Sequence, residues 1–554
     1  MAGFSLRQSF GPLHKYIFGS YPAQPILEIG RKKIEQKIKF QTANRSSKRL
    51  IMAAFYSKYF QRFSICFPRK FFNSWPGFIA CGIMLIAYGI MIIACGIMTM
   101  PQAIIKKTAG KEGAMNTHLH ADTVIVGSGP GGATVARELA QRGRKVLLLE
   151  RGIDHRPRSY YGSYLGALIY SDRRSLLFTK EGLNIIRPLM VGGATSMYCG
   201  CAAPPPNWLK EKYGVDLDAE VSETIEELEI APLAPELRGT ASTHIAQAAR
   251  ARGYDWQPQL KFMKPARAEK FECRATCMLG CTCGAKWNAA EYVDEAVASG
   301  ADLLTKAHVE RVLVQDGHVS GVEGRLNGKP FTVHAETVVL AAGGIGTPRI
   351  LQASGFNQAG QGMTMDVTVM VYGFIKEKGT GNEPPMTWSW ENQEVGYMLS
   401  TLIDPWLLYP IINALKGPKY AAYWPRYNNI LGVMIKLKDD ISGGVFPDGT
   451  ISKPLTDNDR PRLKMAEDVC REILVEAGAE KSSIFMTPLR GTHPSGTVRI
   501  GSMVDQDLQT EVQGLYVCDA SAFPEALDRP TVLTIIGMGK RLAKHIAPTP
   551  ARLS

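Results

Sequence analysis

The chain has 554 residues and a formal net charge of +13, a length at which two or more domains are expected. Residues 1–74 contain 14 Lys or Arg and only two acids, Glu28 and Glu35, which accounts for +12 of that charge. The nearly neutral remainder excludes a basic nucleic-acid-binding surface, and we expect no nucleic-acid partner.

An uncharged segment follows the basic extension, which covers residues 1–77. Residues 78–100 contain no charged side chain, and about 20 such residues are enough to span a bilayer. The pattern predicts a single-pass membrane protein with a transmembrane helix over 78–100 and a linker over 101–120. Lys and Arg retained in the cytoplasm would put the extension inside and the body outside. Basic residues flank both ends of the span, so the orientation stays open, and a transit-like or signal-bearing leader is the alternative.

A strand, a glycine turn and a helix open the body. Residues 123–126 are apolar and β-branched, and the residues after the turn suit a helix. In such a unit Gly127 allows the tight turn, Gly129 lets the backbone approach a pyrophosphate, and Gly132 lets the helix pack on the strand. Glu150 ends the next predicted strand, where an acid binds ribose hydroxyls. The pattern predicts a Rossmann-like dinucleotide site but does not distinguish FAD from NAD.

Further elements follow along the body. The loop at Gly192 and Gly193 is rich in small residues, which allow backbone to lie against a flat ring system. Residues 333–341 read as one buried strand, residues 343–348 as a glycine turn and residues 349–354 as a helix. Residues 462–477 predict an amphipathic helix.

The loop near the carboxyl end carries His493 among small residues. Alcohol oxidation removes a hydroxyl proton and a carbon-bound hydride, so it needs a base beside a hydride acceptor. An imidazole suits the first task near neutral pH, and a flavin suits the second. We therefore interpret His493 as the proton acceptor. The alternative is a structural histidine that caps a loop.

Five blocks of this sequence resemble the glucose-methanol-choline (GMC) oxidoreductases, which include FAD-dependent alcohol dehydrogenases and oxidases. The blocks are the Gly127 turn, the Gly192-Gly193 loop, and residues 338–355, 493–501 and 514–536. The resemblance implies FAD, a parallel sheet in the flavin domain, a mostly antiparallel sheet in the substrate domain, and oxidation of a CH–OH group. The expected fold is therefore α/β with a Rossmann-like FAD-binding domain.

The resemblance also assigns residues and domains. The implied cofactor-binding residues are Gly127, Gly129, Gly132, Glu150, Gly192, Gly193, Val309 and Asp519. Of these, Asp519 matches the acid near the pyrophosphate and ribityl chain, and Val309 matches the adenine-side backbone contact. The expected FAD-binding domain comprises residues 121–204, 271–360 and 486–548, and the substrate-binding domain comprises 205–270 and 361–485.

Two positions depart from the family. Its members usually carry His or Asn as a second catalytic group before the last helix, where this chain has Arg529. An arginine cannot act as a neutral base, but it can stabilise a developing alkoxide, and we expect that role for Arg529. At the flavin loop, where relatives often carry Asn, this chain has Tyr198.

A cysteine cluster is the last notable feature. Cys273, Cys277, Cys281 and Cys283 fall within 11 residues, a density typical of metals, clusters or disulfides. Their spacing fits neither usual zinc pattern. The segment is similar to that of membrane-associated sugar dehydrogenases of the family, which carry an iron-sulfur cluster. Such a cluster at these four residues, disulfides, and free buried thiols all stay open.

The leading hypothesis is a membrane-anchored FAD-dependent enzyme that oxidises a small-molecule alcohol. It would pass electrons to a membrane acceptor, a quinone or cytochrome, or to oxygen. The alternatives are a catalytically degenerate flavoprotein that serves as an electron-transfer or structural subunit, and a flavin-dependent double-bond reductase or desaturase. The second catalytic group missing from its usual position favours the degenerate flavoprotein, whereas His493 opposes it.

Overall fold

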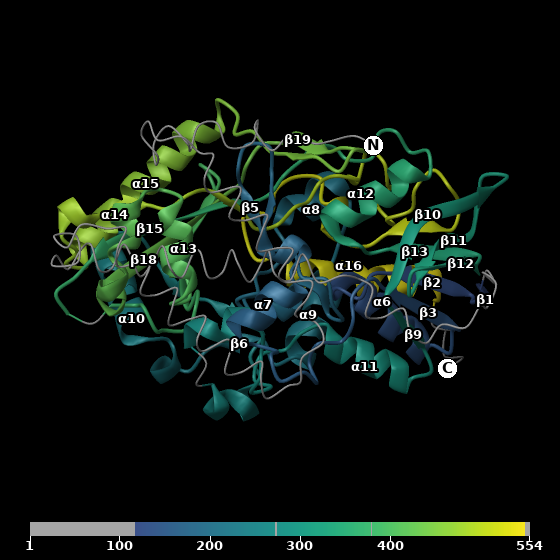
Figure 1. The fold of residues 1–554 in the computed structure, drawn as a ribbon, viewed down its shortest axis with the longest axis horizontal. Helices are drawn as coiled ribbons and strands as arrows, with labels where there is room; N and C mark the ends of the chain where they lie inside the picture. Colours follow the sequence, from purple (N-terminus) through teal and green to yellow (C-terminus); the bar gives the residue numbers. More distant parts are fainter. Residues whose placement is uncertain (1–116, 272–273, 378, 549–554) are drawn as a thin grey trace, which may run out of the picture. The chain divides into compact units, whose positions relative to one another are not determined.

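The computed structural model describes residues 117–271, 274–377 and 379–548 (Figure 1). The basic extension 1–77 and the predicted transmembrane helix 78–100 lie outside the described residues. Within the described ranges, no helix is both long and apolar enough to cross a membrane.

A five-stranded parallel sheet carries the glycine turn. Its order is β23-β13-β2-β3-β9, and every neighbouring pair is parallel. The strands are β2 (Thr123–Val126), β3 (Val146–Glu150), β9 (Asp302–Thr305), β13 (Thr337–Leu340) and β23 (Leu515–Val517). Every residue of β2 and β3 is buried, as expected when both faces of a parallel sheet are covered.

Helices and a second sheet cover these faces. Helix α6 (Pro130–Gln141) packs against α16 (Val532–Ile546) and α11 (Ala290–Ala298). The second sheet has the order β1-β12-β11-β10, and its strands β10 and β11 contact β3 and β13 of the parallel sheet. Its strands are β1 (Thr117–His120), β10 (Ala307–Gln315), β11 (His318–Leu326) and β12 (Lys329–His334).

The largest sheet has nine strands and is antiparallel except between β22 and β5. Its order is β4-β5-β22-β15-β18-β17-β16-β7, and β21 also pairs with β15. The strands are β4 (Leu177–Phe178), β5 (Asn184–Ile185), β7 (Gln257–Pro258), β15 (Val367–Phe374), β16 (Trp388–Asn392), β17 (Tyr397–Thr401), β18 (Ile430–Leu437), β21 (Phe485–Met486) and β22 (Arg490–Gly491). Helices α10 (Thr240–Ala251) and α15 (Asp459–Glu476) pack against it.

Shorter elements connect these layers. The remaining helices are α7 (Tyr164–Tyr170), α8 (Asn207–Tyr213), α9 (Asp218–Glu227), α12 (Gly343–Ala353), α13 (Leu408–Ala414) and α14 (Pro418–Ala421). The remaining strands are β6 (Ala231–Pro232), β8 (Leu260–Lys261), β14 (Gln361–Met363), β19 (Ser442–Val445) and β20 (Ile451–Ser452).

The structure confirms the α/β class and the Rossmann-like unit, and it corrects two local expectations. Residues 333–341 are not one strand, because the chain leaves the four-stranded sheet after His334 and enters the parallel sheet at Thr337. The glycine-rich segment that follows is not a separate turn, since α12 already begins at Gly343 and contains Pro348. An apolar run in a sequence predicts that the segment is buried. It does not show that the two ends of the segment belong to different sheets.

Candidate active site

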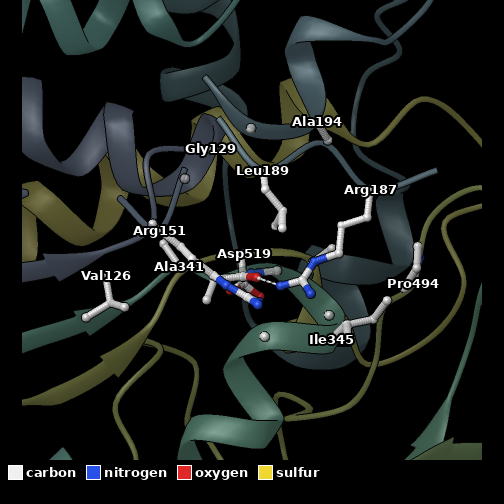
Figure 2. A pocket seen from close by; sticks show the side chains of 18 of the residues that line it. Val126, Gly129, Arg151, Arg187, Leu189, Ala194, Ala341, Ile345, Pro494 and Asp519 are labelled. Atoms are coloured by element: carbon white, nitrogen blue, oxygen red, sulfur yellow. Dashed lines mark hydrogen bonds between the residues drawn. The ribbon is translucent and has the colours of Figure 1, made fainter. Parts of the chain in front are cut away.

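A cavity of about 500 Å³ lies at the carboxyl ends of the parallel strands (Figure 2). Strands β2 and β3 and the residues just after β13 and β23 reach it. Ligands bind at this end of open α/β sheets. Seven of the expected site residues line it: Gly127, Gly129, Glu150, Gly193, Val309, His493 and Asp519. The cavity therefore joins the glycine turn to the His493 loop, although they are far apart in sequence.

Close backbone contacts explain the glycine spacing. Gly127 has a φ of +105°, and a Cβ there would come within 2.4 Å of the Ala341 carbonyl oxygen. A Cβ on Gly132 would come within 1.9 Å of the Gly127 carbonyl oxygen. A Cβ on Gly129 would meet nothing within 4 Å, so this position faces open space. Gly127 and Gly132 allow the close backbone contacts that shape the turn, whereas Gly129 leaves room for a ligand.

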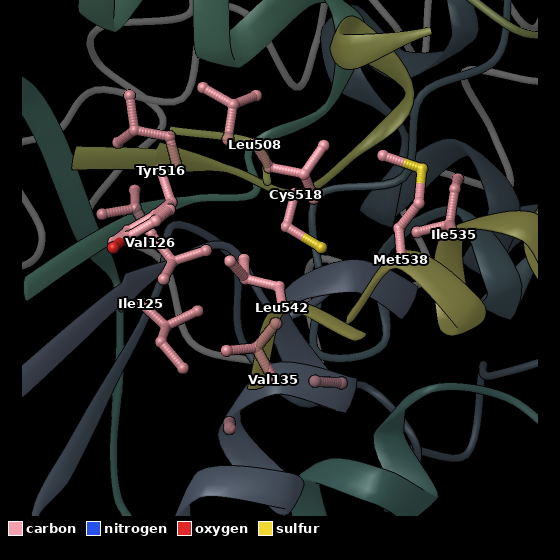
Figure 3. Close-up of a cluster of buried hydrophobic side chains, with 14 of the residues drawn as sticks. Ile125, Val126, Val135, Leu508, Tyr516, Cys518, Ile535, Met538 and Leu542 are labelled. Carbon is pink, nitrogen blue, oxygen red and sulfur yellow. The ribbon is translucent and has the colours of Figure 1, made fainter. Parts of the chain in front are cut away.

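The turn is supported by a tightly packed core (Figure 3). Side chains of β2, α6 and α16 meet there, among them Ile125, Val135 and Leu542, each at most 1 % exposed. Full burial of such aliphatic side chains contributes about 1.5–3 kcal/mol each. This packing fixes the position of the α6 amino terminus.

Helix α6 directs that amino terminus at the cavity. It begins at Pro130, directly after Gly129, and no side chain caps it. The first backbone N–H groups of a helix lack intrahelical partners and attract anions. Arg151 and Arg187 also extend toward the cavity (Figure 2), and Arg187 is paired with Asp172 at 3.1 Å. The α6 end of the cavity suits a diphosphate, whereas the Arg187 guanidinium lies 3.5 Å from the Ala342 carbonyl oxygen. Sequence reasoning missed both arginines.

Two buried carboxylates mark different parts of the cavity wall. Glu150 accepts hydrogen bonds from the backbone N–H and hydroxyl of Ser128, at 3.1 and 2.6 Å, which fixes the acid beside the glycine turn. Asp519 accepts from the Gly343 N–H at 2.8 Å and the Thr347 hydroxyl at 2.5 Å. Burial raises the pKa of Asp519, and these hydrogen bonds oppose that shift.

The remaining expected cofactor residues either line the cavity or pack behind its wall. Gly192 and Gly193 both have positive φ angles, and a Cβ on Gly193 would come within 2.9 Å of the Gly129 Cα. Their loop therefore packs directly on the glycine turn. Gly132 and Gly192 do not line the cavity themselves. Val309 lies in β10 and reaches the cavity beside Glu150.

His493 is paired with an aspartate that the sequence did not suggest. Strand β22 pairs with β15 so that Gly491 lies opposite Val367. Because the two strands are antiparallel, the residues that follow Gly491 lie beside the residue that precedes Val367. The His493 Nδ1 lies 2.7 Å from the Asp366 Oδ2. Asp366 is only 1 % exposed, and a carboxylate there fixes the Nδ1–H tautomer of the ring. The other ring nitrogen, Nε2, is left to accept a proton.

Asp366 is itself held firmly. Its φ of +45° is unusual for a residue with a side chain, although Asp tolerates it better than most. Its Oδ1 accepts the Asp528 N–H at 3.1 Å. Asp439 accepts the backbone N–H groups of Met365 and Val367, at 3.0 and 3.1 Å, and so fixes both neighbours of Asp366. Asp439 in turn forms a fully buried ion pair with Lys453 at 2.7 Å.

A buried lysine completes this region. The Lys436 Nζ lies 3.5 Å from the His493 Nδ1 and donates to the Thr492 hydroxyl at 3.3 Å. Burial and the charge of Lys436 lower the pKa of His493, while Asp366 opposes the shift. Burial likewise lowers the pKa of Lys436. The lowered pKa favours the neutral form of His493, which is the form that can accept a proton.

Arg529 does not join His493 in the cavity. Its guanidinium is paired with Glu391 at 3.1 Å and with Asp528 at 3.0 Å. Two carboxylates already neutralise its charge, so the expected contact with an alkoxide is not supported by the arrangement. Burial and the nearby Asp366 raise the pKa of Asp528 to about 6, against the effect of Arg529. Tyr198 points elsewhere too, since its hydroxyl donates to the Trp287 carbonyl at 2.7 Å.

The described cysteines do not assemble a metal site. Cys273 lies outside the described residues, and Cys281 and Cys283 hold their sulfurs 3.8 Å apart, too far for a disulfide bond. Over residues 117–271, 274–377 and 379–548, no group of three or more His, Cys, Asp or Glu is placed to hold a metal ion. The iron-sulfur hypothesis gains no support from this part of the chain.

Comparison with known proteins gives a consistent result. GMC oxidoreductase family models match residues 186–369 and 455–539, and an NAD(P)-binding Rossmann-like model matches residues 125–162. An uncharacterized protein of Methanocaldococcus jannaschii is 28% identical over 433 residues, covering 77% of this chain and 99% of its own. A long-chain-alcohol oxidase of Arabidopsis thaliana is 22% identical over 521 residues, covering 79% of this chain and 69% of its own.

Solved structures share the fold. Pyridoxine 4-oxidase from Mesorbium loti superposes with a TM-score of 0.57 at 14% identity, covering 77% of this chain and 99% of its own. Formate oxidase of Aspergillus oryzae gives a TM-score of 0.54 at 15% identity, covering 78% of this chain and 99% of its own.

Proposed function

Because the chain belongs to the GMC oxidoreductase family, whose members are FAD-dependent, we propose that it oxidises the CH–OH group of an alcohol to a carbonyl. His493 is the proposed proton acceptor. The observation that carries the proposal is the pairing of His493 with Asp366 at the same cavity that the glycine turn lines. An oriented, neutral imidazole beside a dinucleotide cradle is what this reaction requires.

The cavity residues fit FAD. The uncapped α6 amino terminus and the open space at Gly129 suit the diphosphate. Glu150 suits ribose hydroxyls, and Asp519 is fixed at the α12 amino terminus. When bound, the flavin ring supplies the hydride acceptor.

The proton is handled by residues of this chain. Nε2 of His493 takes the hydroxyl proton, and Asp366 stabilises the imidazolium that forms through the Nδ1 hydrogen bond. Lys436 disfavours that imidazolium and so keeps the resting base neutral. A base with a pKa near or below the working pH is effective because it is unprotonated before each turnover.

The substrate class and electron acceptor are inferred more coarsely. The resemblance to a long-chain-alcohol oxidase favours an apolar alcohol, with electrons passed to oxygen or to a membrane quinone or cytochrome. A catalytically inactive flavoprotein is the second candidate. It is favoured by Arg529, whose charge is already neutralised by Glu391 and Asp528.

Anaerobic stopped-flow spectroscopy tests the proposal. FAD-saturated protein is mixed with long-chain primary alcohols, sugars and sterols, and flavin bleaching is followed. We expect bleaching by at least one alcohol, and a rate lowered by about 10²–10⁴ in His493→Gln, the typical contribution of a catalytic base. Equal rates in both proteins would reject His493 as the base. Bound flavin that no alcohol bleaches would favour the inactive flavoprotein.

A further inference from the structure

Exposed apolar side chains gather on one surface of the protein. Ten of the sixteen exposed large hydrophobic side chains in the described ranges lie in two short segments. The segment around α7 and β4 contributes Leu165, Leu168, Ile169, Leu176, Phe178 and Ile186. The segment 406–415, which includes α13, contributes Trp406, Leu407, Ile411 and Leu415, the last 69 % exposed. We call these ten side chains the apolar face. Contiguous exposed apolar surface of this kind marks a binding site.

The two segments are in contact. The Leu407 backbone N–H donates to the Tyr164 hydroxyl at 3.4 Å. Trp406 and Tyr164 also line one small cavity of about 220 Å³, and Leu408 packs against the cluster that includes Tyr170 of α7. The start of α7 and the start of α13 are therefore in contact, and Figure 1 shows where the two helices lie in the fold.

The charge around this surface is positive. Residues 405–438 contain no Asp or Glu. Lys416 and Lys419 are exposed beside the Tyr420 ring, at 5.4 and 4.8 Å, and neither forms an ion pair with a described residue. Across the face, Arg173 and Lys180 are exposed as well. Apolar side chains next to a Trp and unpaired lysines are the composition of segments that lie in a membrane interface.

We propose that the apolar face docks onto an anionic lipid bilayer. Ile411 and Leu415 enter the boundary between headgroups and acyl chains, Trp406 lies at headgroup level, and Lys416 and Lys419 contact lipid phosphates. A second copy of the chain fits less well, because lysines are depleted at protein interfaces. Docking goes beyond the proposed oxidation, and it does not require the predicted helix 78–100.

The face also leads to the candidate active site. Ile186 is 44 % exposed and belongs to the apolar face, and it lines the large cavity as well. Strand β5 ends just before it and pairs with β4, which carries Phe178. An apolar molecule in the lipid would thus meet a continuous apolar surface up to the cavity.

Quenching of Trp406 by brominated lipid tests the docking. Full-length protein is reconstituted into phosphatidylcholine–phosphatidylglycerol vesicles with plain or brominated acyl chains. The emission of Trp406 is the difference between wild type and Trp406→Phe, so insertion of residues 78–100 does not enter the readout. We expect bromination to lower this difference by half or more. An equal difference in both vesicles would overturn the proposal.

Matched variants localise the contact. Ile411→Asp with Leu415→Asp should remove most of the Trp406 quenching, whereas Val297→Asp, at an exposed site on α11 (45 %) outside the apolar face, should not change it. Lys416→Glu with Lys419→Glu should weaken quenching only when phosphatidylglycerol is present. Retained flavin absorbance shows that each variant is folded. Unchanged quenching in the Asp double variant, or a detergent-solubilised dimer that this variant makes monomeric, would overturn the proposal.

Discussion

The cofactor cradle and the proton-acceptor region are built in different ways. The glycine turn of the cradle is one continuous segment, in which Gly127 and Gly132 shape the backbone within six residues. The proposed proton acceptor, His493, depends on three strands of the antiparallel sheet or their ends, which bring Asp366 and Lys436 to it. Backbone geometry made by neighbours in sequence can be read from spacing. Charges supplied from distant strands become visible only in the folded chain.

The largest expected effect is a loss of stability when the buried ion pair between Asp439 and Lys453 is broken, because this pair supports the proton-acceptor region. Lys453→Met would leave Asp439 buried without its cation, which typically destabilises a protein by about 3–5 kcal/mol. Urea unfolding of the flavin-loaded protein measures the loss. Lys464→Met is the control, because that lysine is 61 % exposed in its ion pair with Asp468 and such pairs contribute at most about 1 kcal/mol. Equal midpoints for the two variants would show that the pair is dispensable.

Two variants, Gly132→Ala and Gly129→Ala, test the cofactor cradle, because only the first places its new Cβ against protein atoms. In Gly132→Ala the new Cβ collides with the Gly127 carbonyl, and overpacking of this kind costs about 1–3 kcal/mol. In Gly129→Ala the Cβ meets no protein atom, so the apoprotein should unfold as wild type does but bind FAD more weakly. Thermal unfolding without FAD and titration with FAD separate the two effects. Equal unfolding temperatures for both apoproteins would contradict the steric argument.

The Asp366 pairing predicts a smaller, purely catalytic effect. Asp366→Asn keeps the size of the side chain and tolerates its positive φ, but it no longer carries the charge that stabilises the imidazolium. We expect flavin reduction to slow by about tenfold to a hundredfold, less than the loss of the base itself. The control Asp172→Asn removes a carboxylate that pairs with Arg187 at the cavity wall instead. If it slows reduction as much as Asp366→Asn does, the special role of Asp366 is rejected.

The smallest expected effect is a shift in the pH dependence of the flavin reduction rate. Protonated His493 cannot act as a base, so the reduction rate should fall as pH drops through its pKa, which lies below the usual value of about 6.5. Lys436→Met removes a cation that holds this pKa down. The acid limb of the pH–rate profile, where the reduction rate falls, should therefore move to higher pH by about one unit. The rate above the limb should change little. An unmoved limb would show that burial alone sets the pKa of His493.

The sequence predicted the parts of the site that depend on local backbone. The turn at Gly127, the acid Glu150 and the loop histidine His493 all reach one cavity, and the helix expected over 462–477 forms over Asp459–Glu476. Their roles in binding and catalysis stay predictions. Asp366 was not predicted because one acid before an apolar strand has no distinctive spacing. Arg529 was assigned from its position alone, and the carboxylate of Glu391 that pairs with it lies 138 residues earlier in the chain. The anchor over 78–100 stays a prediction.

The parallel sheet has a consequence for how the chain is made. Strand β2 leaves the ribosome about 390 residues before β23, which pairs with β13 at the edge of the same sheet. At about 5–20 residues per second, that interval is roughly 20–80 s. Until then β13 has an unpaired edge and Asp519 does not yet exist, so the nascent protein is both prone to misassociation and unable to complete its cradle. FAD loading is therefore expected to follow translation, and ribosome-arrested chains that stop before Leu515 should retain no flavin.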